Sequence, residues 1–471
     1  MSDELWRWSA GRIAASIAAR DISAREVVEA SIARMRAVNG AINAVTVDLS
    51  ERALAAADRA DAAVKRGERL GPLHGVPVTI KENVDQAGCA TTNGVIANRD
   101  AIAHHDSPVV ANLLKAGAIP IGRTNTPAFS FRLDTVNDLR GRTHNPWRRG
   151  VTPGGSSGGA SASVAAGIVP LAHGNDIAGS VRYPAFCCGL AGLRPSFGRV
   201  PAYLPTQKAE RAISAQLLSV QGPIARTVSD VRLGLAAMAA RDPRDPWWVP
   251  APLEGPSLPR RVAVVREPAD LDGVAPSPAI ARALDQAAHW LAQAGYDVVD
   301  ERTPGFTAAA RLWFEMFVPE FRHFMQADFE RDGDDGIRTA MAHMAAIAPD
   351  LAPDMHLKAL ARRTKLQRDW WLHLERTPLV LAPVSAVPPY EIGFDVESRA
   401  RTEQVWRECS TLMAVPVLGL PGMAVPTGLA DGLPVGVQIV GPRFREDLCL
   451  AAAEAIEARA AFAAGLPIDP R

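Results

Sequence analysis

GGSSGGASASVAAGIVPLAHGNDIAGS, residues 154–180, begins with paired serines among glycines and ends on a further serine, Ser180. The run does not match a phosphate loop, because a P-loop requires GxxxxGK[ST] and a dinucleotide loop requires GxGxxG between a strand and a helix. An isolated GGSSGG would indicate a flexible linker. Here it continues into ASASVAAGI, which predicts a helix of small residues, and VPLAHG, which predicts a strand. We therefore expect ordered core rather than a tether.

The sequence on both sides of this run alternates between helical and strand patterns. Residues 1–70 read as helices, and Ser23 and Glu26 have the spacing of a capping box. Residues 76–81 are rich in β-branched side chains and predict a buried strand that ends at Lys81. A helix from 107 and a short strand at 119–122 follow. RVAVVRE, YDVVDE, TPLVLAPV and GLPVGVQIVG predict later strands, with a helix over 277–295 between the first two.

This alternation predicts the α/β fold class: a single large α/β/α layered domain with a central mixed, mostly parallel sheet covered by helices. The expected parts of the 1–471 domain are the N-terminal helices (1–70), a core that contains the serine-glycine run (71–240), a proline-rich crossover (243–259), a strand-helix-strand unit with a helical excursion (260–376), and C-terminal strands with a helix (377–471).

The composition excludes several classes of partner. Lys plus Arg and Asp plus Glu both total 51 among 471 residues, so the net charge is zero and neither nucleic acid nor an anionic membrane is expected. The five cysteines form no CxxC pair, so we expect free thiols, no metal and no cofactor. The start of the chain has no apolar signal region, and no run of about 18 apolar residues occurs. These features predict a cytoplasmic protein.

The end of the serine-glycine run offers the chemistry of acyl transfer. Amide or ester hydrolysis needs a nucleophile, a base that takes its proton, and N–H donors for the oxyanion. Ser180 lies in NDIAGSVR, a glycine-containing turn suited to aiming consecutive N–H groups at one point. The candidate donors for an oxyanion hole are Ile177, Ala178, Gly179 and Ser180.

The histidines do not supply an evident base for the nucleophile. None of the ten histidines lies in a recognisable triad motif, and His173 falls in an apolar strand, where a core histidine is the favoured interpretation. Lys81, at the end of its strand, can act as a base if burial keeps it neutral. The residues alone leave the alternative open that Lys81 is an ordinary lysine paired with Glu82.

Several blocks together resemble one family. GVPVTIKENV, GRTHNPW, PGGSSGGASASVAAGIVPLAHGNDIAGSVRYPAFCCGLAGLRPSFGRVP, GPIARTVSD and GLPVGVQIVG resemble the signature blocks of the amidase signature family of serine hydrolases, over nearly the whole chain. By this resemblance Ser180 is the nucleophile, Ser156 the bridging serine and Lys81 the base. The resemblance also implies a cis peptide between Gly155 and Ser156, and an acyl-enzyme that water cleaves.

The same resemblance suggests supporting residues. Ser157 is expected to bond near Lys81 or the loop backbone, with simple turn formation as an equal alternative. Asp176 and Arg182 resemble the buried acid-arginine pair of the family, for which we favour a structural role that holds the turn. Cys187 and Cys188 are interpreted as packing residues.

The chain departs from the family pattern at two positions of the turn, where relatives read close to G-T/S-D-x-G-G-S. Asn175 and Ala178 are unusual there. A positive φ at Ala178 would strain the alanine, whereas an ordinary φ would let its methyl group narrow the acyl pocket. Ala128 replaces a glutamate common in relatives.

The block around Ala128 supplies pocket candidates, with an ordinary core segment as the alternative. For Arg132 a surface position is favoured over binding of a substrate carboxylate. With the apolar C-terminal segment LMAVPVLGLPGMAVP, these residues favour an apolar or aromatic acyl group. The candidate pocket residues are Phe129, Ser130, Phe131, Arg132 and Tyr183.

The leading hypothesis is an amidase (hydrolase of linear amide C–N bonds) that releases ammonia or an amine from a small-molecule amide through a Ser180 acyl-enzyme. The catalytic subunit of a glutamyl-tRNA amidotransferase and a non-catalytic relative remain as alternatives. A homodimer is left open, and the sequence does not identify the amide.

Overall fold

The computed structural model describes residues 2–349, 351–460, 462 and 468–470. Its strands are β1 (Val45–Asp48), β2 (Pro77–Lys81), β3 (Ile119–Thr124), β4 (Val136–Asn137), β5 (Gly141–Arg142), β6 (Leu171–Asp176), β7 (Ala191–Arg194), β8 (Val220–Ala225), β9 (Arg261–Val264), β10 (Asp297–Val299), β11 (Leu379–Pro383), β12 (Gly422–Ala430) and β13 (Leu433–Val440). Strands β4 and β5 pair with each other, and the other strands form one 11-stranded sheet in the order β1-β3-β2-β6-β8-β7-β12-β13-β11-β9-β10.

The sheet is mixed, as predicted, but the expectation that it is mostly parallel is wrong. Parallel pairing is confined to β3-β2-β6 and β11-β9-β10, and the remaining neighbours, including β1 and β3 and the whole centre of the sheet, are antiparallel. One cause is the β12–β13 hairpin, whose two-residue turn consists of Asp431 (φ 50°) and Gly432 (φ 75°). Two central residues with positive φ fold a strand directly back on itself.

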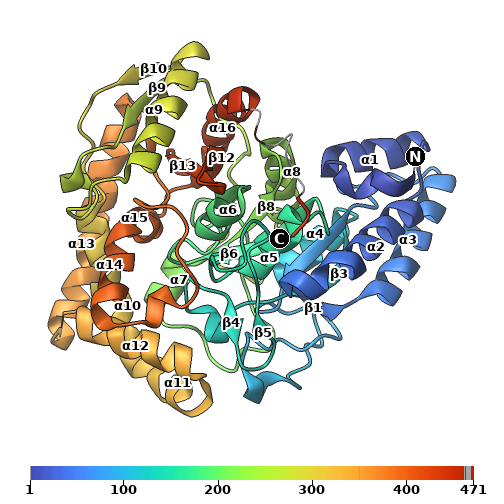
Figure 1. The fold of residues 1–471 in the computed structure, drawn as a ribbon, viewed down its shortest axis with the longest axis horizontal. Coiled ribbons are helices and arrows are strands. Elements are labelled where there is room, and N and C mark those ends of the chain that lie inside the picture. The colour runs from blue at the N-terminus through green and yellow to red at the C-terminus, as the bar shows by residue number, and fades with distance from the viewer. Residues whose placement is uncertain (1, 350, 461, 463–467, 471) are drawn as a thin grey trace.

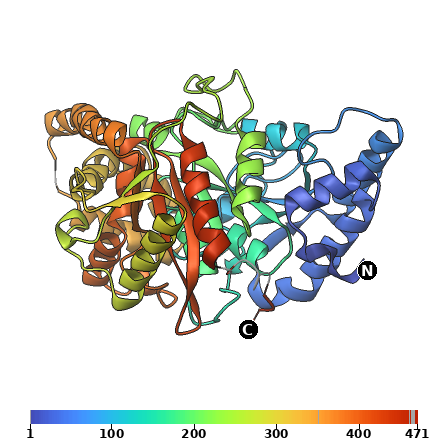
Figure 2. The same cartoon turned by 90° about the horizontal axis from the view of Figure 1, so that it is seen from above.

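The helices are α1 (Ala10–Ala19), α2 (Ala24–Ile42), α3 (Ser50–Lys65), α4 (Pro108–Lys115), α5 (Gly158–Ala165), α6 (Arg182–Cys188), α7 (Ile213–Leu218), α8 (Val228–Met238), α9 (Pro278–Gln293), α10 (Thr307–Phe324), α11 (Gln326–Asp332), α12 (Asp335–Ile347), α13 (Pro353–Arg376), α14 (Arg399–Glu408), α15 (Ser410–Leu418) and α16 (Glu446–Ala460). Helices α4, α8, α16 and α9 contact one another in that order and form one layer on the sheet. Helices α5 and α6 contact each other and pack separately on the strands of the sheet. Figures 1 and 2 show the N-terminal helices at one end and α9–α14 at the other.

The N-terminal prediction is confirmed in its main feature and wrong in one detail. Ser23 and Glu26 form the capping box at the start of α2. However, residues 45–48 form strand β1 rather than part of a helix, because they pair with β3 at the edge of the sheet. Four residues between two helices carry too little periodicity to reveal such an edge strand.

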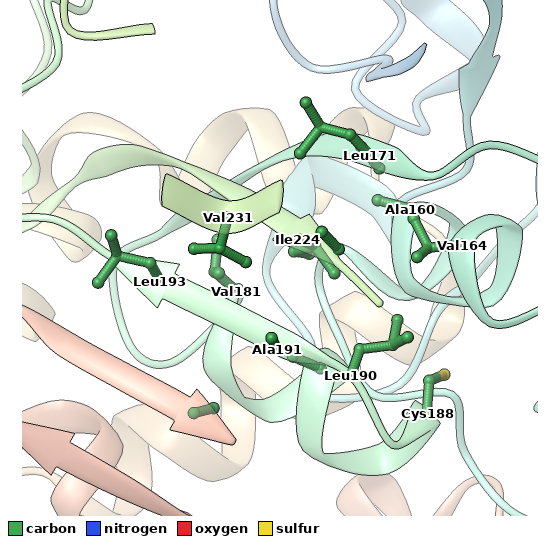
Figure 3. Packing of buried hydrophobic residues seen from close by; sticks show 14 of the residues in the cluster. Ala160, Val164, Leu171, Val181, Cys188, Leu190, Ala191, Leu193, Ile224 and Val231 are labelled. Carbon is green, nitrogen blue, oxygen red and sulfur yellow. The ribbon is translucent and has the colours of Figure 1, made fainter. Parts of the chain in front are cut away.

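The predicted ordered core after the serine-glycine run is confirmed. Every residue of α5 is buried. A Cβ atom added to Gly158 would lie 2.4 Å from Thr135 Oγ1, and one added to Gly159 would lie 2.6 Å from the Asn125 amide nitrogen. The small residues therefore let this helix lie directly against its neighbours. Figure 3 shows Ala160 and Val164 from α5 in the same buried cluster as the side chains labelled Leu171, Val181, Leu190, Leu193, Ile224 and Val231.

The predicted helical excursion over 306–376 is present as α10 to α13. A second buried cluster joins these helices to α15 and includes Trp313, Phe317 and Ala178. Ala178 belongs to the turn that precedes α6, so this cluster forms an apolar wall beside that turn. No helix in the described part of the chain is long and apolar enough to cross a membrane.

Candidate active site

Lys81 is the last residue of β2, and its side chain is fully buried. Its Nζ lies 2.7 Å from Ser156 Oγ, 3.1 Å from Ser157 Oγ and 2.8 Å from Asn175 Oδ1. Strand β2 is parallel to β6, so the carboxyl ends of both strands reach the same edge of the sheet and bring Lys81 next to Asn175.

The alternative of a Lys81–Glu82 ion pair is not seen. Glu82 is the first residue after β2, and its carboxylate bonds instead to Arg140, with 3.3 Å between Arg140 Nε and Glu82 Oε2. Burial lowers the pKa of Lys81 well below its ordinary value, with a smaller opposing effect from the charge of Asp176. The environment therefore favours the free amine that a general base requires.

The loop before α5 carries Ser156 and Ser157, both buried. The Gly155–Ser156 peptide is cis, as the resemblance implies. Gly154 has φ 80°, and a Cβ atom on it would lie 2.6 Å from Pro184 Cα. Glycine is therefore required at 154 both for its backbone conformation and for the close approach of α6.

Ser180 follows the turn between β6 and α6 and is 7% exposed. The predicted set of four oxyanion donors needs one correction, because the Gly179 N–H already donates to Asp176 Oδ1 at 2.8 Å. Within the described residues the N–H groups of Ile177, Ala178 and Ser180 make no hydrogen bond. These three N–H groups remain available to an oxyanion.

Positive φ in this turn falls on Gly179 (98°) and not on Ala178. The strain considered for Ala178 is therefore absent, and its methyl group is buried in the apolar cluster beside the turn. Trp313 belongs to the same cluster, and its Nε1 donates to the Ile177 carbonyl oxygen at 3.1 Å. This bond fixes the direction of the peptide that follows Ile177.

Asp176 and Arg182 form the buried pair that the sequence suggested, with 3.1 Å between Arg182 Nε and Asp176 Oδ2. Arg194, which sequence reasoning missed, adds a bond from Nη1 to the Asp176 carbonyl oxygen at 2.6 Å. Burial alone would raise the pKa of Asp176, but Arg182 and Arg194 outweigh it and lower that pKa to about 2. Because Asp176 also accepts from Gly179 and Val181, the group holds the turn.

His173 is a core histidine, as favoured. Its Nε2 lies 2.8 Å from Gln221 Oε1, and burial lowers its pKa to about 3. Cys187 and Cys188 are buried free thiols whose pKa values burial raises, in keeping with packing residues. No group of three or more metal-ligating side chains occurs among the described residues.

A cavity of about 800 Å³ opens beside Ser156. Of the predicted pocket residues, Phe129, Ser130 and Phe131 line it. Other lining residues were not predicted, because they come from distant segments. They include Asn83, Asn175, Ile177, Ala215, Gln221, Phe317 and Met325, and much of the segment 197–212.

Arg132 and Tyr183 do not line this cavity, which corrects two predictions. Arg132 is buried and its guanidinium bonds to the carboxylate of Asp395 at 2.7 and 3.1 Å, so it is neither a surface residue nor free to bind a substrate carboxylate. Tyr183 lies in the core, with its ring stacked near Phe186. Phe129 and Ser130 have positive φ, and such a turn redirects the following side chains in a way that strand or helix spacing does not predict.

The chain matches the family model described as Amidase over residues 26–450. It is 49% identical over 459 residues to an indoleacetamide hydrolase of Bradyrhizobium diazoefficiens, covering 97% of this chain and 87% of that protein. It is 34% identical over 496 residues to a component of the glutamyl-tRNA(Gln) amidotransferase of Acidothermus cellulolyticus, covering 97% of this chain and 95% of that protein.

Among solved structures, a substrate complex of 6-aminohexanoate cyclic dimer hydrolase superposes with a TM-score of 0.84 at 27% identity, covering 98% of both chains. The matches in sequence and in fold therefore span the serine loop, the turn before α6 and nearly all of the sheet. We conclude that the chain is a hydrolase of amide C–N bonds and belongs to the amidase signature family.

Proposed function

We propose that this enzyme hydrolyses a primary amide with an aromatic acyl group through an acyl-enzyme at Ser180, with Ser156 and Lys81 as the proton relay. The observation that carries the proposal is the contact of 2.7 Å between Lys81 Nζ and Ser156 Oγ in a fully buried site. A neutral amine in this position is a base that can act through the neighbouring hydroxyl.

In the proposed reaction Ser180 Oγ attacks the amide carbon, its proton passes to Ser156, and the proton of Ser156 passes to Lys81. The tetrahedral oxyanion accepts hydrogen bonds from the free N–H groups of Ile177, Ala178 and Ser180. The relay then returns a proton to the leaving nitrogen, so that the C–N bond breaks and ammonia departs. Water, deprotonated by the same relay, cleaves the ester and releases the carboxylic acid.

The walls of the cavity support an aromatic acyl group. Phe131 lines the cavity and stacks on Phe317, with 5.0 Å between ring centroids. Phe129, also in the wall, stacks on Phe329 at 4.0 Å. Flat apolar surfaces of this kind favour an aryl ring over a charged chain. The relative that is 49% identical is named for hydrolysis of indoleacetamide, an arylacetic primary amide.

The test is a panel of indole-3-acetamide, phenylacetamide, benzamide, acetamide, glutamine and an anilide, read by ammonia or amine release. We expect kcat/KM to be highest for the arylacetic primary amides and to vanish in Ser180→Ala, with the folded structure unchanged by circular dichroism. Full turnover by Ser180→Ala would overturn the nucleophile assignment. Ammonia release from glutamine that requires an added partner would instead support the amidotransferase alternative.

A further inference from the structure

The Asn175 side chain has a defined orientation beside Lys81. Its Nδ2 donates to Asn83 Oδ1 at 2.9 Å, and Asn83 Nδ2 donates to Ser130 Oγ at 2.8 Å. Ser130 Oγ in turn donates to Asn93 Oδ1 at 2.7 Å. Because every donor in this series points away from Lys81, the Asn175 carboxamide presents its oxygen to the lysine, and Asn175 Oδ1 only accepts.

Two of the three polar neighbours of Lys81 occupy its N–H groups. A neutral amine has two N–H donors and one lone pair. Asn175 Oδ1 takes one N–H, at 2.8 Å. Ser157 Oγ–H donates to the Asn175 carbonyl oxygen at 3.4 Å, so Ser157 Oγ takes the second N–H, at 3.1 Å. The lone pair is left facing the third neighbour, Ser156 Oγ.

We propose that Asn175 is a positioning residue of this enzyme, whose carboxamide oxygen directs the Lys81 lone pair at Ser156 and whose own orientation is set by Asn83 and Ser130. This inference rests on the proposed function of Lys81 as the base. It assigns a role to a position at which, by the resemblance, the chain departs from the threonine or serine of the family pattern. The longer asparagine reaches both Lys81 and Asn83.

The same hydrogen bonds connect the base to the substrate cavity. Ser130 lies between Phe129 and Phe131, and all three line the cavity. Ser130 also lies 2.8 Å from Thr126 Oγ1, so its hydroxyl is held from both sides. A change in the packing of this wall therefore reaches Lys81 through two asparagine side chains.

The charged groups around Lys81 set the background for a pH test. Asp176 and His173 belong to β6, and Arg123 of β3 donates to the Lys81 carbonyl oxygen at 3.3 Å. Glu82, the next residue in the chain, bonds to Arg140. A variant at Asn175 leaves all of these groups in place, so a change in the titration of Lys81 reports on residue 175.

The test compares Asn175→Asp with Asn175→Leu. A carboxylate 2.8 Å from Nζ stabilises the ammonium form, so Asn175→Asp should move the acid limb of activity to higher pH by about one unit or more. Its rate at pH 7 should fall about tenfold or more and recover at alkaline pH. Asn175→Leu removes the oxygen that accepts from Lys81, which stabilises the ammonium form less, so the acid limb of the pH–activity profile should move to lower pH. The rate on the plateau of this profile should fall, because the Lys81 lone pair is no longer directed at Ser156.

The primary readout is the rate at which a fluorophosphonate labels Ser180 as a function of pH, measured beside kcat and KM. Labelling does not depend on the choice of amide. Asn39→Asp is the matched control, because Asn39 Oδ1 accepts from the N–H groups of Ala44 and Val45 away from the site, and its profile should equal that of the unaltered enzyme. If Asn175→Asp does not fold, Asn175→Thr takes its place. Its hydroxyl should restore labelling above that of Asn175→Leu.

Each result has one consequence. An unmoved acid limb in Asn175→Asp, or equal labelling in Asn175→Thr and Asn175→Leu, would overturn the positioning role. A raised KM with an unmoved limb would assign Asn175 to substrate contact instead. Absence of Ser180 labelling in the unaltered enzyme would overturn the proposed function, and the inference with it.

Discussion

Lys81 Nζ and Ser156 Oγ are 2.7 Å apart although 75 residues separate them in the chain. The lysine ends the fully buried strand β2, and the serine lies in the loop before a fully buried helix. An amine in this position has lost its hydration, and burial lowers its pKa well below the ordinary value. The fold therefore favours the neutral form of Lys81, which its proposed role as the base requires.

Burial of Lys81 should cost stability in a pH-dependent way. A lysine with a lowered folded pKa is protonated in the unfolded chain and neutral in the folded one between the two pKa values, so stability rises with pH in this window. The slope for one such group is about 1.4 kcal/mol per pH unit. Lys81→Met should thus be more stable than the unaltered protein at neutral pH, with a gap that narrows towards pH 10.

This is measured by urea unfolding at several pH values between 6 and 10. Lys115→Met is the control, because Lys115 is an exposed lysine at the end of α4. A gap between Lys81→Met and the unaltered protein that stays constant with pH would show that Lys81 keeps its proton when the chain folds.

The two serines next to Lys81 should differ in importance. Ser156 stands in the proposed relay, and loss of a general acid-base group costs about 10²- to 10⁴-fold in rate. Ser157 Oγ, at 3.1 Å, accepts an N–H of Lys81 and has no part in the proposed relay, and loss of one such bond costs roughly tenfold. Steady-state kcat of Ser156→Ala and Ser157→Ala checks the order, and equal losses would contradict it.

Gly179 and Ala178 are neighbours in the turn, but the addition of a methyl group at Gly179 should be far more damaging than its removal at Ala178. Gly179→Ala should abolish activity, because φ is 98° and the new Cβ would lie 2.7 Å from Leu412 Cβ. Ala178→Gly relieves no strain, since Ala178 has no positive φ, and should cost only about 0.5–1 kcal/mol of stability. Because Ala178 packs in the apolar cluster and does not line the cavity, the range of acyl groups should stay unchanged.

Thermal unfolding and the amide panel measure both variants. If Ala178→Gly alters neither stability nor substrate range, the departure at this position has no consequence.

Trp313 should support catalysis from outside the reacting groups. Its Nε1 donates to the Ile177 carbonyl oxygen at 3.1 Å, and its ring stacks between Phe317 and Trp406. Trp313→Phe keeps an aromatic ring but removes the donor, so kcat should fall roughly tenfold with little change in KM. A change confined to KM would show instead that Trp313 acts through substrate binding.

Phe131 should determine the preference for aromatic amides. Its ring lines the cavity and stacks on Phe317. Phe131→Leu should raise KM for phenylacetamide by about tenfold, because loss of apolar contact in a pocket costs about 1–3 kcal/mol. Acetamide, which has no ring, serves as the internal control. Equal effects on both substrates would place the aryl group elsewhere in the cavity.

Much of the local structure could be predicted because it depends on short-range chemistry. The β-branched run before Lys81 forms β2, the small residues after the serine-glycine run form α5, and Ser23 with Glu26 caps α2. Strand β1 and the antiparallel centre of the sheet could not be predicted, because short strands acquire their identity and direction from the partners they meet.

The sequence by itself determined which residue types were present for the chemistry: Lys81, Ser156 and Ser180, in blocks that resemble one family. Only the tertiary structure decided which hydrogen-bonding groups in and around the site are free. It committed the Gly179 N–H to Asp176 and the Arg132 guanidinium to Asp395, and it placed Asn175 against Lys81. Hydrogen bonds are directional and each donor is used once, so availability depends on neighbours far away in the chain.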